Sequence, residues 1–228
     1  MTENRERTDK ASAVITGCTS GLGRSLTDRF LSEGWFVTGC GRRADLLASL
    51  ARGREDSIST VVCDIRLENH VKALRDAIAS GPGHIDALVL NAGAIGQLPL
   101  PQFLQTNLME LRKLFETNVF ANVNIVQQLR PLLRSGGIIV HITSDAARTP
   151  YPGWSGYGAS KAAFSLAVET LNVELESSGL KAVNIDPGDM DTAMHRLAIP
   201  DADPGSLRRS EDAAAEVYGT IIRNLGRK

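Results

Sequence analysis

Short apolar segments alternate with longer segments of helical periodicity along most of the chain. Apolar, β-branched runs predict strands at residues 13–16, 35–40, 58–63, 87–90, 138–142 and 181–185. Apolar positions recur with helical spacing at residues 22–32, 44–51, 68–79, 110–133, 157–177 and 211–223. Because strands that are apolar throughout are buried on both faces, this alternation predicts a parallel sheet with helices on both sides. With right-handed crossovers, the prediction is a doubly wound α/β fold of six strands.

The chain shows no Pro/Gly/Ser-rich linker and no shift in composition, so we expect residues 11–228 to form one domain. The first ten residues mix acidic and basic side chains without an apolar stretch, which predicts a solvated tail rather than a signal peptide. Residues 190–210 follow the last predicted strand and include a segment rich in Asp and Pro. We expect this segment to form a lid over a ligand site.

The composition narrows the class of protein without naming a function. The 228 residues are 43% hydrophobic and 22% charged, an ordinary globular mixture that excludes a disordered or fibrous chain. A net charge of -1 argues against nucleic acid or an acidic membrane as an obligate partner. Three cysteines and four histidines show no metal-ligand spacing, and no apolar run is long enough to span a bilayer. These features predict a cytoplasmic protein with reduced thiols and no metal site.

A glycine-rich segment follows the first predicted strand and opens directly into a helix. Gly17 permits a tight turn, Gly21 lets the backbone approach a pyrophosphate, and Gly23 permits close packing of helix on strand. The helix N-terminus adds N–H donors and the positive end of the helix dipole. A glycine-rich turn alone is weak evidence because many turns need positive φ, but its position between strand and helix favours a dinucleotide site.

The second predicted strand ends without the carboxylate that would bind the ribose diol of NAD. Gly41, Arg42 and Arg43 stand there instead, and two guanidinium groups suit the 2′-phosphate of NADP. The alternative is a solvated pair of arginines at the start of a surface helix. We predict NADP rather than NAD, with Arg42 the better candidate for the phosphate contact.

Polar residues also follow the third and fourth strands. Asp64 could accept a hydrogen bond from the adenine amino group, or could instead cap the helix that begins near Leu67. Asn91 could hold the strand end beside the cofactor, and Gly93 could let the nicotinamide ribose approach. Neither signal is specific alone.

The strongest chemical signal is Tyr157 with Lys161, which share one face of a predicted helix at spacing i, i+4. A nearby cation can lower the pKa of a tyrosine, which can then exchange a proton with a carbonyl or alcohol oxygen. This spacing also arises by chance, so it needs supporting residues. Ser144 lies just after the fifth strand, where its hydroxyl could bind a carbonyl, and Asn118 lies in the long central helix.

With Pro187, Gly188 and Thr192 after the sixth strand, the ordered set of motifs resembles the compact, single-domain branch of the short-chain dehydrogenase/reductase family over about residues 11–222. The resemblance implies a Rossmann-like fold and hydride transfer between NAD(P) and a carbonyl or alcohol carbon. It also implies a homodimer built from the two long central helices. A family tetramer often depends on a seventh strand, for which this chain has no candidate.

The same resemblance assigns a catalytic tetrad. Tyr157 would be the general acid-base and Ser144 would orient and polarise the carbonyl. Lys161 would hold the nicotinamide ribose and lower the pKa of Tyr157, while Asn118 would keep a water relay in line with Lys161. The residues that match the family's cofactor contacts are Gly17, Ser20, Gly21, Leu22, Gly23, Asp64, Asn91, Ala92, Gly93, Tyr157, Lys161, Pro187, Gly188 and Thr192.

Tyr151 and Trp154 lie between Ser144 and Tyr157, and they predict either an aromatic pocket wall or a cover for the sheet end. We expect His195 to be a surface residue of the lid. The leading function is NADP(H)-dependent interconversion of a ketone or aldehyde and an alcohol. One alternative is a 3-oxoacyl-thioester reductase, with a carrier protein received by the basic residues Arg196, Arg208 and Arg209. A different class of protein, a non-catalytic NADP-binding sensor or scaffold, is the second alternative.

Overall fold

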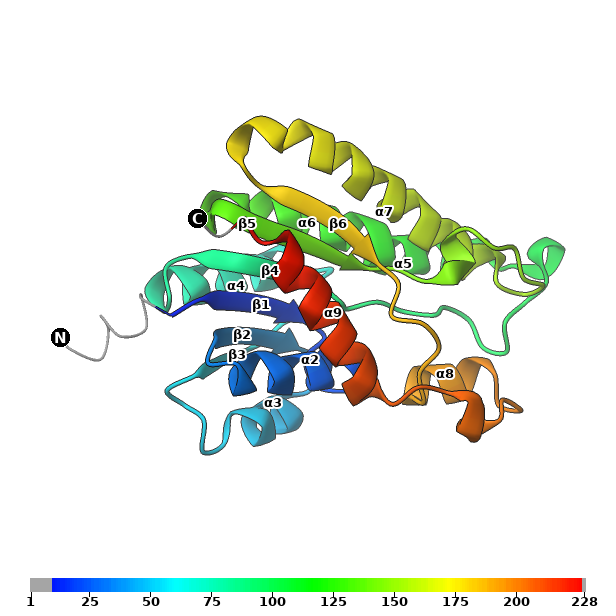
Figure 1. The fold of residues 1–228 in the computed structure, drawn as a ribbon. Helices are drawn as coiled ribbons and strands as arrows, with labels where there is room; N and C mark the ends of the chain where they lie inside the picture. Colours follow the sequence, from blue (N-terminus) through cyan, green and yellow to red (C-terminus); the bar gives the residue numbers. More distant parts are fainter. Residues whose placement is uncertain (1–9, 227–228) are drawn as a thin grey trace.

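The computed structural model describes residues 10–226, and its centre is a parallel sheet (Figure 1). Its strands are β1 (Ser12–Thr16), β2 (Phe36–Gly41), β3 (Ile58–Val62), β4 (Ile85–Leu90), β5 (Leu133–Ile142) and β6 (Lys181–Ile185). They lie in the order β3-β2-β1-β4-β5-β6, and every neighbouring pair is parallel. The predicted six-stranded α/β fold is confirmed. The order of the strands reverses between β1 and β4, where ligands of such sheets bind.

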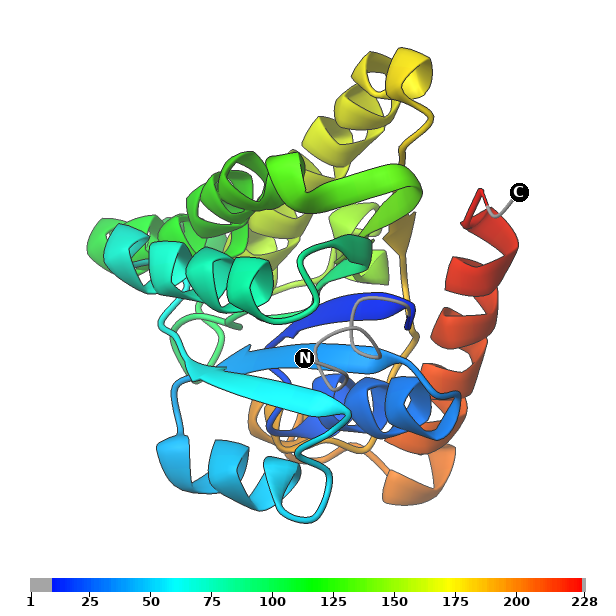
Figure 2. The same cartoon turned by 90° about the vertical axis from the view of Figure 1, so that its left-hand side faces the viewer.

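Helices cover both faces of the sheet. One face carries α2 (Gly21–Ser32), α3 (Ala44–Ala51) and α9 (Ser210–Asn224), and the other carries α4 (Glu68–Ser80), α6 (Ala121–Leu129) and α7 (Ser155–Glu174). Figure 2 shows α9, in red, on the opposite side of the strands from α7, in yellow. Alternate residues of a buried strand point to opposite faces, so Ala13 and Ile15 join the first core while Val14 joins the second.

Aromatic side chains pack α9 against α2 on the face of the sheet that carries both helices. The ring of Phe30 lies 5.0 Å from both Trp35 and Tyr218 in edge-to-face geometry. Trp35 Nε1 donates a hydrogen bond to the Tyr218 hydroxyl at 3.1 Å. The C-terminal helix is therefore part of the core, and among residues 10–226 no seventh strand follows it.

The helix predicted over residues 110–133 is not continuous. It consists of α5 (Leu108–Phe115), a π-helical turn η2 (Glu116–Phe120), α6 and a 3-10 turn η3 (Arg130–Leu132). The π turn carries Asn118, whose side chain is held by other parts of the chain. Pro131 has no N–H to continue a helix, and β5 begins directly afterwards. β5 therefore starts five residues earlier than predicted, because Leu133 already pairs with Ile85 ahead of the Gly136-Gly137 segment.

The segment after β6 crosses the carboxyl edge of the sheet before it enters α9 (Figure 1). It contains one short helix, α8 (Ala193–Ala198), and a 3-10 turn, η6 (Pro204–Ser206). Backbone hydrogen bonds join its two ends, from Asp191 N to Arg208 O at 2.9 Å and from Arg208 N to Asp189 O at 3.0 Å. In the part of the chain that the structure describes, no helix is both long and apolar enough to cross a membrane. Residues 1–9 of the predicted tail lie outside the described residues.

Candidate active site

The carboxyl ends of the strands open into a cavity of about 1220 Å³. It extends from the residues after β2 and β3, through the glycine loop, to the turn after β5 and to α8. All of the predicted site residues line this cavity except Gly23 and Asn118. The structure thus brings together residues that are up to 175 positions apart, from Gly17 to Thr192, at one edge of the sheet.

The glycine loop has the conformation that its sequence requires. Gly17 has φ 70° and Gly21 has φ 51°, both in the left-handed region that favours glycine. A Cβ atom on Gly23 would lie 2.3 Å from Gly17 O and 2.4 Å from Asn91 Nδ2. Ser20 is the N-cap of α2, yet no side chain caps the helix and its first turn contains no acidic residue. The exposed N–H donors therefore suit an anionic group such as a pyrophosphate.

Asn91 supports this loop from behind. Its Nδ2 donates to Thr16 O at 2.9 Å and to Gly17 O at 3.3 Å, and its backbone N donates to Thr16 Oγ1 at 3.1 Å. Both amide hydrogens are thereby directed at the loop backbone. Asn91 thus joins the end of β4 to the loop after β1, as expected of a residue that holds the strand end.

Two arginines occupy the end of the cavity beyond β2. Arg43 Nη2 donates to Thr19 Oγ1 and to Ser20 Oγ, each at 3.0 Å, so its guanidinium lies across the glycine loop. Arg42 also lines the cavity. The contacts of Arg43 make it as strong a candidate for a phosphate contact as Arg42, which the sequence favoured.

Asp64 is paired with an arginine that the sequence analysis did not single out. Arg66 donates from Nε to Asp64 Oδ1 at 3.0 Å and from Nη2 to Oδ2 at 2.6 Å. This pairing is the largest cause of the low pKa of Asp64, which is about 2. Asp64 does not cap α4, whose N-cap is Leu67. An acid followed two residues later by a base at the cavity edge is the signal that could have revealed this pair.

Tyr157 and Lys161 share one face of α7, as their spacing predicts. Lys161 Nζ lies 5.9 Å from the centroid of the Tyr157 ring and donates to Ile142 O at 2.6 Å. Ser144 follows β5 and its hydroxyl oxygen accepts a hydrogen bond from Ala146 N at 3.2 Å. Lys161 is only 6% exposed, so its ammonium group is held within the wall of the cavity.

Asn118 lies behind this wall rather than on it. Its Oδ1 accepts from Ala94 N at 2.8 Å, and its Nδ2 donates to Ala94 O and to Ser160 Oγ, each at 2.9 Å. Ser160 Oγ in turn donates to Tyr157 O at 2.7 Å. A Cβ on Gly93 would lie 3.4 Å from Asn118 Oδ1 and 3.7 Å from Lys161 Nζ. The side chain of Asn118 therefore ties the π turn to the segment after β4 and to α7, and its predicted water relay stays a prediction.

Burial is the largest influence on the pKa values of both Tyr157 and Lys161. Burial raises the pKa of Tyr157 to about 12, opposed by a hydrogen bond with Ser144 and increased further by the charges of Asp186, Asp145 and Asp189. Burial also lowers the pKa of Lys161 to about 8. Lys161 is not among the largest influences on the pKa of Tyr157, so its predicted lowering of that pKa stays a prediction.

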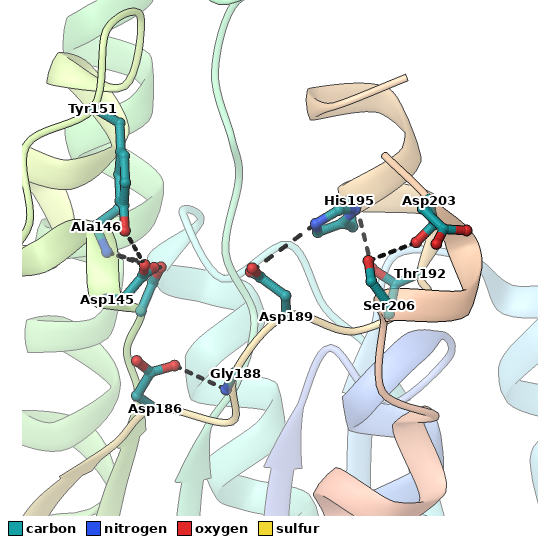
Figure 3. A network of polar contacts seen from close by, with 11 residues as sticks. Asp145, Ala146, Tyr151, Asp186, Gly188, Asp189, Thr192, His195, Asp203 and Ser206 are labelled. Carbon is teal, nitrogen blue, oxygen red and sulfur yellow. Dashed lines mark hydrogen bonds and ion pairs between the residues drawn. The ribbon is translucent and has the colours of Figure 1, made fainter. Parts of the chain in front are cut away.

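Aromatic and acidic side chains line the other end of the cavity. Trp154 and Tyr151 both line it, and the ring centroids of Trp154 and Tyr157 are 5.6 Å apart. His195 Nε2 lies 4.0 Å from Asp189 Oδ1 (Figure 3). The His195 side chain is only 11% exposed, so the expected position on the lid surface is wrong. Among residues 10–226, no group of three or more His, Cys, Asp or Glu side chains could hold a metal ion.

A parallel sheet in the order 3-2-1-4-5-6, with a glycine loop between β1 and α2, defines the Rossmann class of α/β folds. The family model for short chain dehydrogenases matches residues 11–202. Serine 3-dehydrogenase from Agrobacterium fabrum (strain C58 / ATCC 33970) is 36% identical over 181 residues, which cover 78% of this chain and 72% of that protein. The chain therefore belongs to the short-chain dehydrogenase/reductase family of oxidoreductases.

Solved structures of similar proteins include complexes with both nicotinamide cofactors. A short chain dehydrogenase from Burkholderia cenocepacia J2315, solved with NADP, is 25% identical with a TM-score of 0.83 over 94% of this chain and 91% of that chain. A 3-ketoacyl-(acyl-carrier-protein) reductase from Brucella melitensis, solved with NADH, is 26% identical with a TM-score of 0.84 over 92% and 90% of the two chains. The comparisons thus support a nicotinamide cofactor for this chain.

Proposed function

We propose that this protein is an NADP(H)-dependent oxidoreductase that interconverts a ketone or aldehyde and an alcohol, with Tyr157 as the general acid-base. The observation that carries the proposal is the arrangement of one cavity. Tyr157, Lys161 and Ser144 line one end of it, while the glycine loop and two arginines line the other. The fit of the glycine loop to a pyrophosphate, described above, supports the same conclusion.

A nicotinamide cofactor held by the glycine loop would supply or accept the hydride. In the direction of reduction, the Tyr157 hydroxyl donates its proton to the carbonyl oxygen, and a pKa of about 12 keeps that proton in place at neutral pH. The Ser144 hydroxyl, which donates to Asp145 Oδ1 in the free protein, would turn its hydrogen toward the carbonyl oxygen and orient that oxygen beside Tyr157. Lys161, fixed by its hydrogen bond to Ile142 O, would hold the ribose hydroxyls of the cofactor.

The preference for NADP over NAD is supported by charge at the end of β2. Arg42 and Arg43 line the cavity there, and the strand ends without a carboxylate that could bind an unmodified ribose diol. The side chain of Arg43 is already oriented by Thr19 and Ser20. An oriented guanidinium loses less conformational entropy when it binds a phosphate.

We infer a cytoplasmic homodimer in which α5, α6 and α7 of two copies pack together. Exposed apolar side chains on these helices and on the η2 turn between α5 and α6 support this assembly. They are Leu108, Met109, Phe120, Val123, Leu166 and Val173. Sedimentation that gives a monomer at every concentration would contradict this assembly.

The carrier-protein alternative has less support than a free carbonyl substrate. Each arginine of the basic group has an acidic partner: Arg196 pairs with Asp191, Arg208 with Glu216 at 2.9 Å, and Arg209 with Glu211 at 3.6 Å. Their charge is therefore largely neutralised locally. The relative named serine 3-dehydrogenase places small polar alcohols among the substrates to be tested.

The test is oxidation of NADPH with a panel of ketones, aldehydes and diketones, with NADH in parallel and the alcohols in reverse. We expect turnover with NADPH that Tyr157→Phe abolishes. The control is Tyr218→Phe, which removes a hydroxyl from α9 outside the cavity and should leave turnover unchanged. Tight NADPH binding without turnover on a broad panel would instead favour the sensor alternative.

A further inference from the structure

The side chain of Asp145 is fixed beside the residue that orients the substrate. Ser144 Oγ donates to Asp145 Oδ1 at 3.0 Å, and Ala146 N donates to the same oxygen at 2.7 Å. Tyr151 OH donates to Asp145 Oδ2 at 2.7 Å (Figure 3). Three donors from three residues therefore hold the carboxylate in one position on the cavity wall.

This carboxylate carries a full negative charge that no cation in the described residues neutralises. The hydrogen bond from Tyr151 is the largest influence that lowers the pKa of Asp145, and the bonds from Ser144 and Ala146 N act in the same direction. Between residues 10 and 226, no Lys, Arg or His nitrogen lies within 4.0 Å of Asp145.

Two further carboxylates reinforce this charge from another element. Asp186 and Asp189 lie on the segment after β6 and also line the cavity, whereas Asp145 lies on the turn after β5 (Figure 3). Asp186 Oδ1 accepts a hydrogen bond from Gly188 N at 2.9 Å, and the Asp186 charge also acts to raise the pKa of Lys161. The catalytic end of the cavity therefore holds the three carboxylates of Asp145, Asp186 and Asp189 beside the ammonium group of Lys161.

We propose that Asp145 is a specificity-determining residue: its fixed carboxylate selects carbonyl and alcohol substrates that carry a protonated amine near the reacting carbon, over substrates that carry a sulfonate or carboxylate there. The inference rests on the proposed function, because it places the reacting oxygen beside Ser144 and Tyr157. The Ser144 hydroxyl lies 3.0 Å from the Asp145 carboxylate, so a charged substituent next to the reacting carbon would lie close to that carboxylate. At such short separations unit charges at a protein surface interact strongly.

A purely structural role for Asp145 can be separated from its charge. In Asp145→Asn, the remaining carbonyl oxygen can still accept from Ser144 Oγ and Ala146 N, and the amide can donate to the Tyr151 hydroxyl. The turn after β5 should therefore keep its shape. Only the negative charge is removed, so a change in selectivity reports charge rather than packing.

The experiment compares three alcohols of similar size that differ in one group: 1-amino-2-propanol, 1,2-propanediol and 2-hydroxypropane-1-sulfonate. For the wild-type enzyme we expect kcat/KM with NADP to be at least about tenfold higher for the amine than for the sulfonate. Asp145→Asn should reduce that ratio at least about fivefold. The ratio at one pH cancels any change in the pKa of Tyr157, since all three alcohols use the same proton acceptor. Glu174→Gln removes a carboxylate from an exposed position of α7 outside the cavity and should leave the ratio unchanged.

Binding gives a second measurement that does not depend on turnover. Calorimetric titration of the NADP-bound protein should show tighter binding of the amine than of the sulfonate, with a smaller difference in Asp145→Asn. Equal binding of the two by the wild-type protein, or a difference that Asp145→Asn does not change, would overturn the proposal. If the amine binds selectively but no alcohol is oxidised, the proposed function fails while the charge selectivity stands.

Discussion

Replacement of Gly23 by Ala should destabilise the protein, although the same change in an ordinary helix would stabilise it. Gly23 lies in the first turn of α2, where Ala is favoured over Gly by about 1 kcal/mol. The added Cβ would lie 2.3 Å from Gly17 O, a backbone atom, and 2.4 Å from Asn91 Nδ2. Real Cβ atoms essentially never come within 3.0 Å of such neighbours, so the loop must move by at least roughly 0.7 Å.

The loss in the free energy of unfolding follows from the contacts that this displacement breaks. Overpacking of this kind costs about 1–3 kcal/mol. Movement of the Asn91 amide away from Thr16 O would leave buried polar groups unpaired, at about 1–3 kcal/mol more. After subtraction of the helix-propensity gain, we expect a loss of about 1–5 kcal/mol in the free energy of unfolding, centred on about 3 kcal/mol. For a domain of this size a loss of about 3 kcal/mol lowers Tm by roughly 6–12 °C.

Calorimetry of Gly23→Ala and titration with NADPH would measure both consequences, and affinity for NADPH should fall at least about tenfold because the pyrophosphate loop is displaced. Gly219→Ala is the matched control. It lies in α9, and its nearest neighbour would be the end of the flexible Arg223 side chain at 3.3 Å. Unchanged Tm and affinity in Gly23→Ala would refute the view that close packing behind the loop maintains the cofactor site.

Three other predictions concern the two ends of the cavity. Arg43→Ala should weaken NADPH binding by about 1.5–3 kcal/mol with little effect on NADH; equal losses for the two cofactors would argue against a 2′-phosphate contact. Asp186→Asn removes a negative charge that raises the pKa of Tyr157. Because alcohol oxidation needs the tyrosinate, its pH profile should move to lower pH. A profile that moves to higher pH would contradict this sign. Ser160→Ala removes one buried acceptor of Asn118 Nδ2 and should lower the free energy of unfolding by about 1–3 kcal/mol. Denaturant titration measures this loss, and an unchanged midpoint would show that the hydrogen bond is dispensable.

The six strands and their alternation with helices could be predicted, because this pattern depends on local composition. Fully apolar runs of Val, Ile and Leu are favourable only between two layers of helices, so runs such as residues 87–90 specify both a strand and its central position. The positions of site residues followed from the same rule, since a residue just after a parallel strand must lie at the carboxyl edge. The spacing of Tyr157 and Lys161 likewise predicted that they share one face of a helix, but their catalytic role depended on the ordered set of motifs around them.

Features that depend on contacts between distant segments could not be predicted. The π turn contains Asn118, and the side chain of Asn118 forms hydrogen bonds with Ala94 and Ser160, which lie far from it in the sequence. The sign of the pKa change of Tyr157 depends on burial and on carboxylates from two other segments. The early start of β5 depends on its pairing with Ile85, which outweighs the two glycines at 136 and 137.

The backbone bridge between Asp191 and Arg208 has a thermodynamic consequence for ligand binding. It closes the 16 residues from 192 to 207 into a loop whose ends are already joined in the free protein. Bringing the ends of a loop of that length together costs about 2.5 kcal/mol of chain entropy, a cost met during folding rather than on binding. A ligand that orders this segment over the cavity would restrain only the internal motions of a loop whose two ends are already joined. Affinity at this site should therefore depend more on contacts with the ligand than on ordering of the chain.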